Sequence, residues 1–193
     1  MDLEKSLSFI ELLNTFRRVE RALRVPGADR HENDAEHSYN LCMLAWYIVE
    51  SGKLDLNKEL VIKYALVHDL IEAYAGDTDI FSQDESLHIS KHYRESKAAL
   101  RLQNLFPEFS ELHTLIHEYE AKENKESRFV YALDKIEPML HIFEDKGRTW
   151  KENKITIQML IDNKKDKVAH SPELVAFFDS LIEKLKQQEK DLF

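Results

Sequence analysis

Three polar side chains interrupt a strongly apolar segment of the chain. From Leu60 to Ala75, apolar residues occur nearly all round the helical wheel, which predicts a buried helix. His68, Asp69 and Glu72 lie inside this segment. A buried carboxylate is costly unless it is paired, hydrogen-bonded or bound to a cation, and no Lys or Arg lies one turn from Asp69. A divalent cation would satisfy both His68 and Asp69.

The same feature recurs in two other predicted helices. His37 shares a helix face with apolar residues, and Asp134 is an inward carboxylate in the largely apolar stretch 129–140. Two imidazoles and two carboxylates form an N2O2 set that suits one divalent metal ion, whose identity stays open among Mn, Co, Fe, Zn, Ni and Mg. Any one of these side chains alone would more often be a core residue. The adjacent His68–Asp69 doublet favours the metal.

Charge narrows the class of partner. The formal net charge is −9, which disfavours a nucleic-acid polymer, because such binding relies on Lys and Arg that displace counterions from phosphates. A small phosphate ester still fits, since a local group of arginines can hold one phosphate. Such a group precedes His37 in the chain and comprises Arg17, Arg18, Arg21, Arg24 and Arg30. A solvated helix face and loop is the alternative interpretation of these arginines.

Two motifs carry a resemblance to a known family. The order of a His, a His-Asp doublet and a distant Asp resembles the HD-domain superfamily of metal-dependent phosphohydrolases. The residues in these places are His37, His68, Asp69 and Asp134. Residues 30–38, Arg-His-Glu-Asn-Asp-Ala-Glu-His-Ser, resemble the first motif of the branch that contains the bacterial 5′-deoxynucleotidases. Residues 68–77 match its second motif, His-Asp-x-x-Glu-x-x-x-Gly-Asp, and the matching parts span roughly residues 16–140.

The resemblance implies a fold, a reaction and further site residues. It implies an all-α HD-domain helical bundle, often a homodimer, that hydrolyses nucleoside 5′-monophosphates with a bound divalent metal. It also implies that Glu72 and Asp77 are the paired carboxylates at the reacting centre. Water on a metal is acidified, and such a pair can move its proton and protect the leaving sugar oxygen. Which of the two is acid and which is base stays open, but without a cation Glu72 should have a raised pKa.

Three cationic residues are candidates for binding the substrate. Arg21 and Arg30 are the candidates for the phosphate, because a guanidinium presents a fork that matches phosphate oxygens. Lys91 is added because its position is similar to that of a lysine in related chains. The branch usually follows its first Arg with a Trp that closes over the deoxyribose, whereas here Ala22 and Leu23 follow Arg21. We therefore expect weaker discrimination between deoxyribo- and ribonucleotides than the branch usually shows.

Other activities share parts of this pattern. Guanosine tetraphosphate hydrolases of the same superfamily use the same ligands, and some HD-fold oxygenases hold two irons with extra histidines. The histidine pairs spaced four apart are His88 with His92 and His113 with His117. A third alternative is a non-catalytic nucleotide-binding module, although the intact Glu72 and Asp77 count against it.

Long helices must position these residues. Only four Gly and four Pro occur among 193 residues, which leaves few turns and favours an all-α fold. The predicted helices span roughly residues 7–24, 35–51, 57–76, 84–105, 108–122 and 126–147, followed by shorter ones, the last opened by Ser171 and Pro172. The length fits a single HD domain, 1–193, in which the C-terminal helices pack on the motif-bearing part.

The cysteine content and the N-terminus bear on the compartment. Cys42 is the one cysteine and lies in an apolar run, so no disulfide framework exists and a reducing compartment is expected. The first residues lack a signal-peptide pattern, and no segment approaches roughly 18 uninterrupted apolar residues. The sequence predicts a cytoplasmic protein with a small-molecule nucleotide as its substrate and no membrane partner.

Overall fold

The computed structural model describes the backbone of residues 2–77 and 85–193, and the side chains of these residues except 85–88. Nearly all regular structure in this part of the chain is helical, so the all-α prediction is confirmed. The helices are α1 (Leu3–Phe16), α2 (Asp34–Ser51), α3 (Lys58–Val67), α4 (Glu72–Ala75), α5 (Glu85–Leu105), α6 (Ser110–Ala121), α7 (Lys125–Glu144), α8 (Arg148–Glu152), α9 (Ile157–Val168), α10 (Pro172–Gln187) and α11 (Glu189–Leu192). Strands β1 (Glu20–Arg24) and β2 (His31–Asn33) form a small antiparallel ribbon.

Asparagines begin the three helices that carry the site. Asn33 caps α2 by accepting from the backbone N–H of Glu36 at 3.0 Å, while the Glu36 side chain accepts from the backbone N–H of Asn33 at 3.2 Å. Asn57 and Asn124 accept backbone N–H bonds of 3.3 Å and 2.8 Å at the starts of α3 and α7. These side chains satisfy N–H groups that lack a partner within the helix, which sets where each helix begins.

The first predicted helix, 7–24, is wrong in its second half. Helix α1 ends at Phe16, and the following segment forms β1, with Glu20 opposite Asn33 on β2. Residues 20–24 are Glu, Arg, Ala, Leu and Arg, all of which have high helix propensity, but backbone pairing with β2 outweighs this local preference. The consequence is that Arg21 lies on an extended strand instead of a helix.

The predicted helix 57–76 is also interrupted. Helix α3 ends at Val67 and α4 begins at Glu72, and the residues between them form tight turns. The backbone N–H of Glu72 donates to the carbonyl oxygen of Asp69 at 2.8 Å, a spacing of three residues where an α-helix has four. The tightening changes the direction in which side chains leave the backbone, and it falls on the His68–Asp69 doublet.

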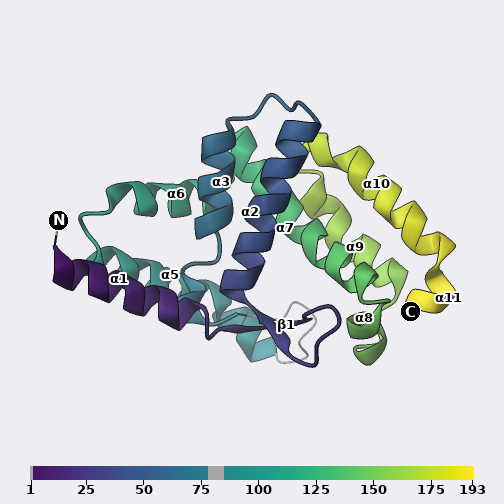
Figure 1. Cartoon of the computed structure of the whole chain (residues 1–193), viewed down its shortest axis with the longest axis horizontal. Coiled ribbons are helices and arrows are strands. Elements are labelled where there is room, and N and C mark those ends of the chain that lie inside the picture. Colours follow the sequence, from purple (N-terminus) through teal and green to yellow (C-terminus); the bar gives the residue numbers. More distant parts are fainter. Residues whose placement is uncertain (1, 78–84) are drawn as a thin grey trace.

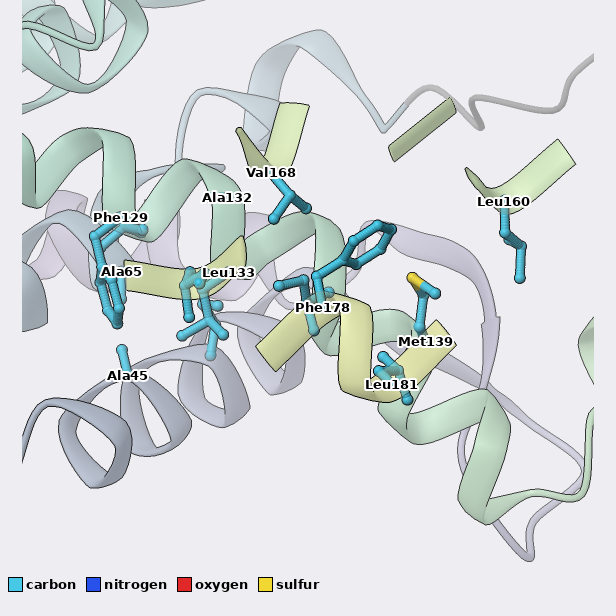
Figure 2. Packing of buried hydrophobic residues seen from close by; sticks show 14 of the residues in the cluster. Ala45, Ala65, Phe129, Ala132, Leu133, Met139, Leu160, Val168, Phe178 and Leu181 are labelled. Carbon is cyan, nitrogen blue, oxygen red and sulfur yellow. The ribbon is translucent and has the colours of Figure 1, made fainter. Parts of the chain in front are cut away.

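Helix α7 lies in the middle of the bundle (Figure 1). Helices α2 and α3 pack together and against α7, and α9 and α10 pack against α7 from the C-terminal part of the chain. Figure 2 shows members of the main buried cluster from all five helices, including Ala45, Ala65, Leu133, Leu160 and Leu181. The C-terminal helices therefore share a core with the helices that carry the motifs. None of the described helices combines the length and hydropathy that a membrane span requires.

Candidate active site

Four of the side chains predicted from the sequence meet at one place inside the bundle. His37 comes from α2, His68 and Asp69 from the turn after α3, and Asp134 from α7. One nitrogen or oxygen atom from each lies within 4.8 Å of the others. His37 Nε2 lies 3.0 Å from Asp134 Oδ1, and His68 Nε2 lies 3.0 Å from Asp69 Oδ2. We call these four residues the metal group.

Both imidazoles direct Nε2 toward this point because Nδ1 has another partner. His68 Nδ1 lies 2.9 Å from the backbone carbonyl oxygen of Ala65, and His37 Nδ1 lies 3.1 Å from Glu137 Oε2. An Nδ1–H that donates to an oxygen leaves Nε2 as the nitrogen that binds a metal. Glu137 was not among the residues singled out in the sequence. Its one signal is a carboxylate three residues after Asp134, on the same face of an apolar helix.

The donor set fits a divalent cation. His68 Nε2 is buried, and although it lies 3.0 Å from Asp69 Oδ2, it makes no hydrogen bond of acceptable geometry with any described residue. Although burial opposes ionisation, His68 holds the pKa of Asp69 below its usual range. Burial also opposes protonation of His37, yet Glu137 and Asp134 raise the pKa of His37 to about 10. A proton on His37 thus supplies, between these carboxylates, the positive charge that a metal ion would otherwise bring.

Arg21 reaches the metal group from β1. Its Nη1 donates to Asp69 Oδ2 at 3.0 Å and to Asp34 Oδ1 at 3.2 Å, and its Nε lies 3.8 Å from Glu32 Oε2. Asp34 and Glu32 are both buried, and their contacts with the guanidinium hold it in place. Arg21 also lines a pocket beside the metal group, where an anion could reach it.

Glu72 and Asp77 line the same pocket as the two carboxylates of the metal group. Glu72 is 6% exposed, and its Oε2 has no hydrogen-bond partner among the described residues. Burial and the negative charges of Asp69 and Asp77 raise the pKa of Glu72, which confirms the rise predicted for the protein without a cation. A carboxyl group whose proton affinity depends on nearby charge is suited to proton transfer.

The pocket changes from charged to apolar along α7. Its lining on this helix runs from Asp134 and Lys135 to Pro138, Met139 and Ile142, one to two turns further on. Further apolar lining comes from Ala22, Leu23, Trp150, Ile155 and Leu160, with Thr149 and Asn153 as polar groups. A charged end joined to an apolar end suits a phosphate ester whose leaving group carries a flat ring.

Part of this lining comes from a region in which the sequence showed no motif. We call Trp150, Asn153, Ile155, Leu160 and Lys164 the C-terminal wall. Trp150 is 1% exposed and stacks on Phe193, with ring centroids 4.7 Å apart and an interplanar angle of 7°. These residues lie on two short helices and the segment between them, where composition and spacing are ordinary. No sequence signal marked them.

Of the other two predicted substrate residues, Lys91 lies at the pocket and Arg30 does not. Lys91 on α5 lines the pocket, and its Nζ lies 3.4 Å from Glu95 Oε1. Arg30 does not line the pocket, and its guanidinium makes hydrogen bonds of 2.7 Å and 2.8 Å to the carboxylate of Glu36. The structure therefore brings Arg21 and Lys91 to the metal group but not Arg30.

The extra histidines considered for a di-iron centre lie elsewhere. His92, His113 and His117 line a separate groove between α5 and α6. His113 Nε2 is engaged with the backbone carbonyl oxygen of Phe106 at 2.8 Å. His88 falls outside the described side chains. Within the described residues, these three histidines do not enter any cluster of metal-type ligands.

An all-helical bundle that brings a His, a His-Asp doublet and a distant Asp to one buried point defines the class of HD-domain proteins. Comparison with known families agrees: residues 13–175 match the model of the HD domain family. The chain therefore belongs to the HD-domain family, which confirms the resemblance drawn from its motifs.

The names of similar proteins point to one branch of this family. Human 5′-deoxynucleotidase HDDC2 is 32% identical over 178 residues, which cover 91% of this chain and 83% of that protein. The 5′-deoxynucleotidase YGK1 of Saccharomyces cerevisiae is 30% identical over 190 residues, covering 92% and 85%. A crystal structure of a predicted metal-dependent phosphohydrolase from Magnetospirillum magnetotacticum superposes with a TM-score of 0.82 at 32% identity, covering 97% of this chain and 94% of that one.

Proposed function

We propose that this chain is a metal-dependent phosphohydrolase that releases phosphate from nucleoside 5′-monophosphates, deoxyribonucleotides included. One observation carries the proposal: the metal group borders a pocket whose apolar lining includes Trp150. The donor atoms of the metal group lie within 4.8 Å of one another. The names of the relatives, 5′-deoxynucleotidases, support the same substrate class.

The metal group would hold one divalent ion. Its four residues are His37, His68, Asp69 and Asp134. Imidazole suits Fe, Ni and Zn whereas carboxylate suits Mn and Mg, so the mixed set leaves the identity open among these metals and Co. When bound, such an ion would lower the pKa of a water and polarise a phosphoryl oxygen.

The chain supplies the groups that bind the phosphate and move protons. We assign Arg21 and Lys91 to the phosphate, because both cations line the pocket and Arg21 is anchored by Asp34. Glu72 and Asp77 are assigned to the protons of the attacking water and of the leaving 5′-oxygen, with the two roles left unassigned between them. Arg30 has no part in this proposal, since its guanidinium is engaged with Glu36 away from the pocket.

The apolar lining would hold the nucleoside. Leu23 and Ala22 line the pocket beside Arg21, at the place where the branch usually has a Trp, and Trp150 contributes an indole from α8. Ala22 is too small to close over the sugar. We therefore keep the expectation of a modest deoxyribose preference, with 5′-phosphates preferred over 3′-phosphates.

A substrate screen tests the proposal. Protein reconstituted separately with each of the six metals is incubated with ribo- and deoxyribonucleoside 5′-monophosphates, and released phosphate is measured. Chelated protein and 3′-dAMP are the controls, and both should give little phosphate. The proposal would be wrong if none of the 5′-monophosphates released phosphate. Hydrolysis of guanosine tetraphosphate, or consumption of oxygen, would then assign one of the alternative HD-fold activities.

We also propose a homodimer of single-domain chains in the cytoplasm. The main buried cluster joins motif-bearing helices to α9 and α10, which supports one domain over 1–193. Tyr39, Met43, Trp46 and Tyr47 lie on one face of α2 and are 44–69% exposed, as large apolar side chains at interfaces between chains often are in the isolated protomer. The free Cys42 fits a reducing compartment. Light scattering on size-exclusion fractions should give twice the mass of the chain. The Trp46→Glu variant should give the mass of a single chain.

A further inference from the structure

Four cationic side chains line the pocket, and one of them differs from the rest. They are Arg21, Lys91, Lys135 and Lys164. Three have carboxylate partners: Arg21 is bonded to Asp69 and Asp34, Lys91 pairs with Glu95, and Lys135 with Asp134. Among the described residues, Lys164 alone of the four makes no hydrogen bond and no salt bridge.

Lys164 is also the most buried of these lysines. It is 6% exposed, whereas the side chains of Lys91 and Lys135 are 42% and 26% exposed. A buried ammonium without a partner costs free energy of folding. The adjacent apolar neighbour on the same face of α9, Leu160, lines the pocket as well, so Lys164 occupies a position where an apolar residue would pack without this cost.

Lys164 lines the same pocket as Asp69 and Asp134 of the metal group. Helix α9 packs along α7. Burial and the positive charge of Lys135 lower the pKa of Lys164 to about 7, while the negative charge of Asp134 acts in the opposite direction. Asp134 is a member of the metal group and lines the same pocket as Lys164, so a phosphate held at the metal group would share this pocket with the ammonium.

We propose that Lys164 is a phosphate-binding residue, a cation from α9 that contacts a non-bridging oxygen of the substrate phosphate together with Arg21. This inference rests on the proposed function. The phosphate supplies the partner that the described residues do not, and a phosphate dianion next to the ammonium keeps it protonated. Lys164 thereby brings the C-terminal part of the chain into contact with the reacting group as well as with the nucleoside.

Equilibrium binding of inorganic phosphate tests this directly. Titration calorimetry on the metal-loaded protein compares wild type with Lys164→Met, which keeps the length of the side chain and removes its charge. We expect phosphate to bind about 10- to 100-fold more weakly to Lys164→Met, as hydrogen bonds to charged groups typically contribute. Lys164→Arg should retain most of the affinity. Lys165→Gln, at the exposed next position on α9, is the matched control and should bind as wild type does.

Two further measurements separate this role from a structural one and from the proposed function. Lys164→Met should melt at a higher temperature than wild type, because an unpaired buried charge is removed, so a loss of phosphate affinity cannot be attributed to unfolding. Deoxyadenosine, which lacks the phosphate, should bind equally to both proteins. Unchanged phosphate affinity in Lys164→Met, or a loss confined to deoxyadenosine, would overturn the role of Lys164 even if dAMP is still hydrolysed. Absence of turnover in wild type with the phosphate effect intact would count against the proposed function alone.

Discussion

The two walls of the pocket differ in how they are held in place. The metal group is fixed by buried hydrogen bonds at each imidazole: Glu137 holds His37 and the carbonyl oxygen of Ala65 holds His68. The C-terminal wall depends on packing, with Trp150 stacked on Phe193 and Lys164 without a polar partner in the described part of the chain. A rigid polar constellation suits the chemical step, whereas an apolar wall suits recognition of the varied nucleoside.

This contrast predicts that substitutions in the metal group abolish activity while those in the C-terminal wall change affinity. The largest effect is expected for Asp134→Asn, which removes a charged donor from the metal group. The protein should lose most of its bound metal and almost all activity while circular dichroism still shows a helical fold. Metal content is measured by elemental analysis, with Asp166→Asn on the exposed side of α9 as the control. Full metal occupancy in Asp134→Asn would remove that residue from the ligand set.

Glu72→Gln should separate chemistry from metal binding. The amide cannot take or give the proton, so kcat should fall by about 10²–10⁴-fold, the usual contribution of a positioned acid or base. Bound metal and KM should change little, because Glu72 is outside the metal group. Steady-state kinetics and elemental analysis measure these quantities, and Glu59→Gln on the exposed face of α3 is the control. An unchanged kcat would make Glu72 a structural residue.

Glu137→Gln tests whether Glu137 orients His37 in the metal group. Glu137 accepts from His37 Nδ1 and lies 2.9 Å from His141 Nε2, so it orients an imidazole without touching the reacting centre. Loss of such an outer partner typically costs about 10–100-fold in metal affinity. Competition with a chelator measures this affinity, and Glu144→Gln, exposed on the same helix, should have none of the effect. Equal affinity in both variants would show that packing alone orients His37.

The stability of the C-terminal wall should depend on pH through Lys164. Burial, together with Lys135, lowers the pKa of Lys164 to about 7 from a usual value of 10.5. Between these two values the unfolded chain binds more protons than the folded one, so this group makes the free energy of unfolding rise with pH by up to about 1.4 kcal/mol per unit. Lys164→Met should therefore be more stable than wild type at and below pH 7, and the difference should shrink as the pH approaches 10.5.

Urea unfolding in chelating buffer at a series of pH values gives these differences. The charged groups that act on Lys164 are Lys135, Lys167 and Arg21, which favour its neutral form, and Asp134, which favours its charged form. A difference that is the same at pH 6 and pH 10 would contradict a lowered pKa of Lys164.

The smallest effect is expected at Leu23. Rejecting a 2′-hydroxyl requires an apolar wall against the sugar, and an unpaired buried hydroxyl costs about 1–3 kcal/mol, roughly 5- to 150-fold in rate. Wild-type protein should prefer dAMP over AMP by less than about 100-fold, and Leu23→Ala should bring the ratio closer to one. Paired kcat/KM values on the two nucleotides measure both. If Leu23→Ala leaves this ratio unchanged, Leu23 does not form the wall against the sugar, and Trp150 is the next residue to substitute.

The sequence alone determined the fold class and the polar residues that had to be explained. His37, His68, Asp69 and Asp134 stood out because each is a polar side chain on an apolar helix face, a local pattern that burial makes costly. The start of α3 at Asn57 was equally local, since a side-chain cap acts over three residues. These features need no knowledge of what lies far away in the chain.

Only the tertiary structure decided which residues share the pocket. The segment from Glu20 to Arg24 consists of residues with high helix propensity, but pairing with β2 makes it a strand that carries Arg21 to Asp69, a residue 48 positions away. Arg30 resembled Arg21 in sequence, yet the nearby Glu36 engages it outside the pocket.

The same holds for Glu137, which holds His37 in place, and for the C-terminal wall. Glu137 is the partner of His37 because α2 and α7 pack side by side, although the two residues are 100 positions apart in the chain. Trp150 and Lys164 carry no motif, and their place in the pocket follows from the packing of α8 and α9 against α7. Long-range packing has no signature in a short stretch of sequence, because the partner that gives a side chain its role lies elsewhere in the chain.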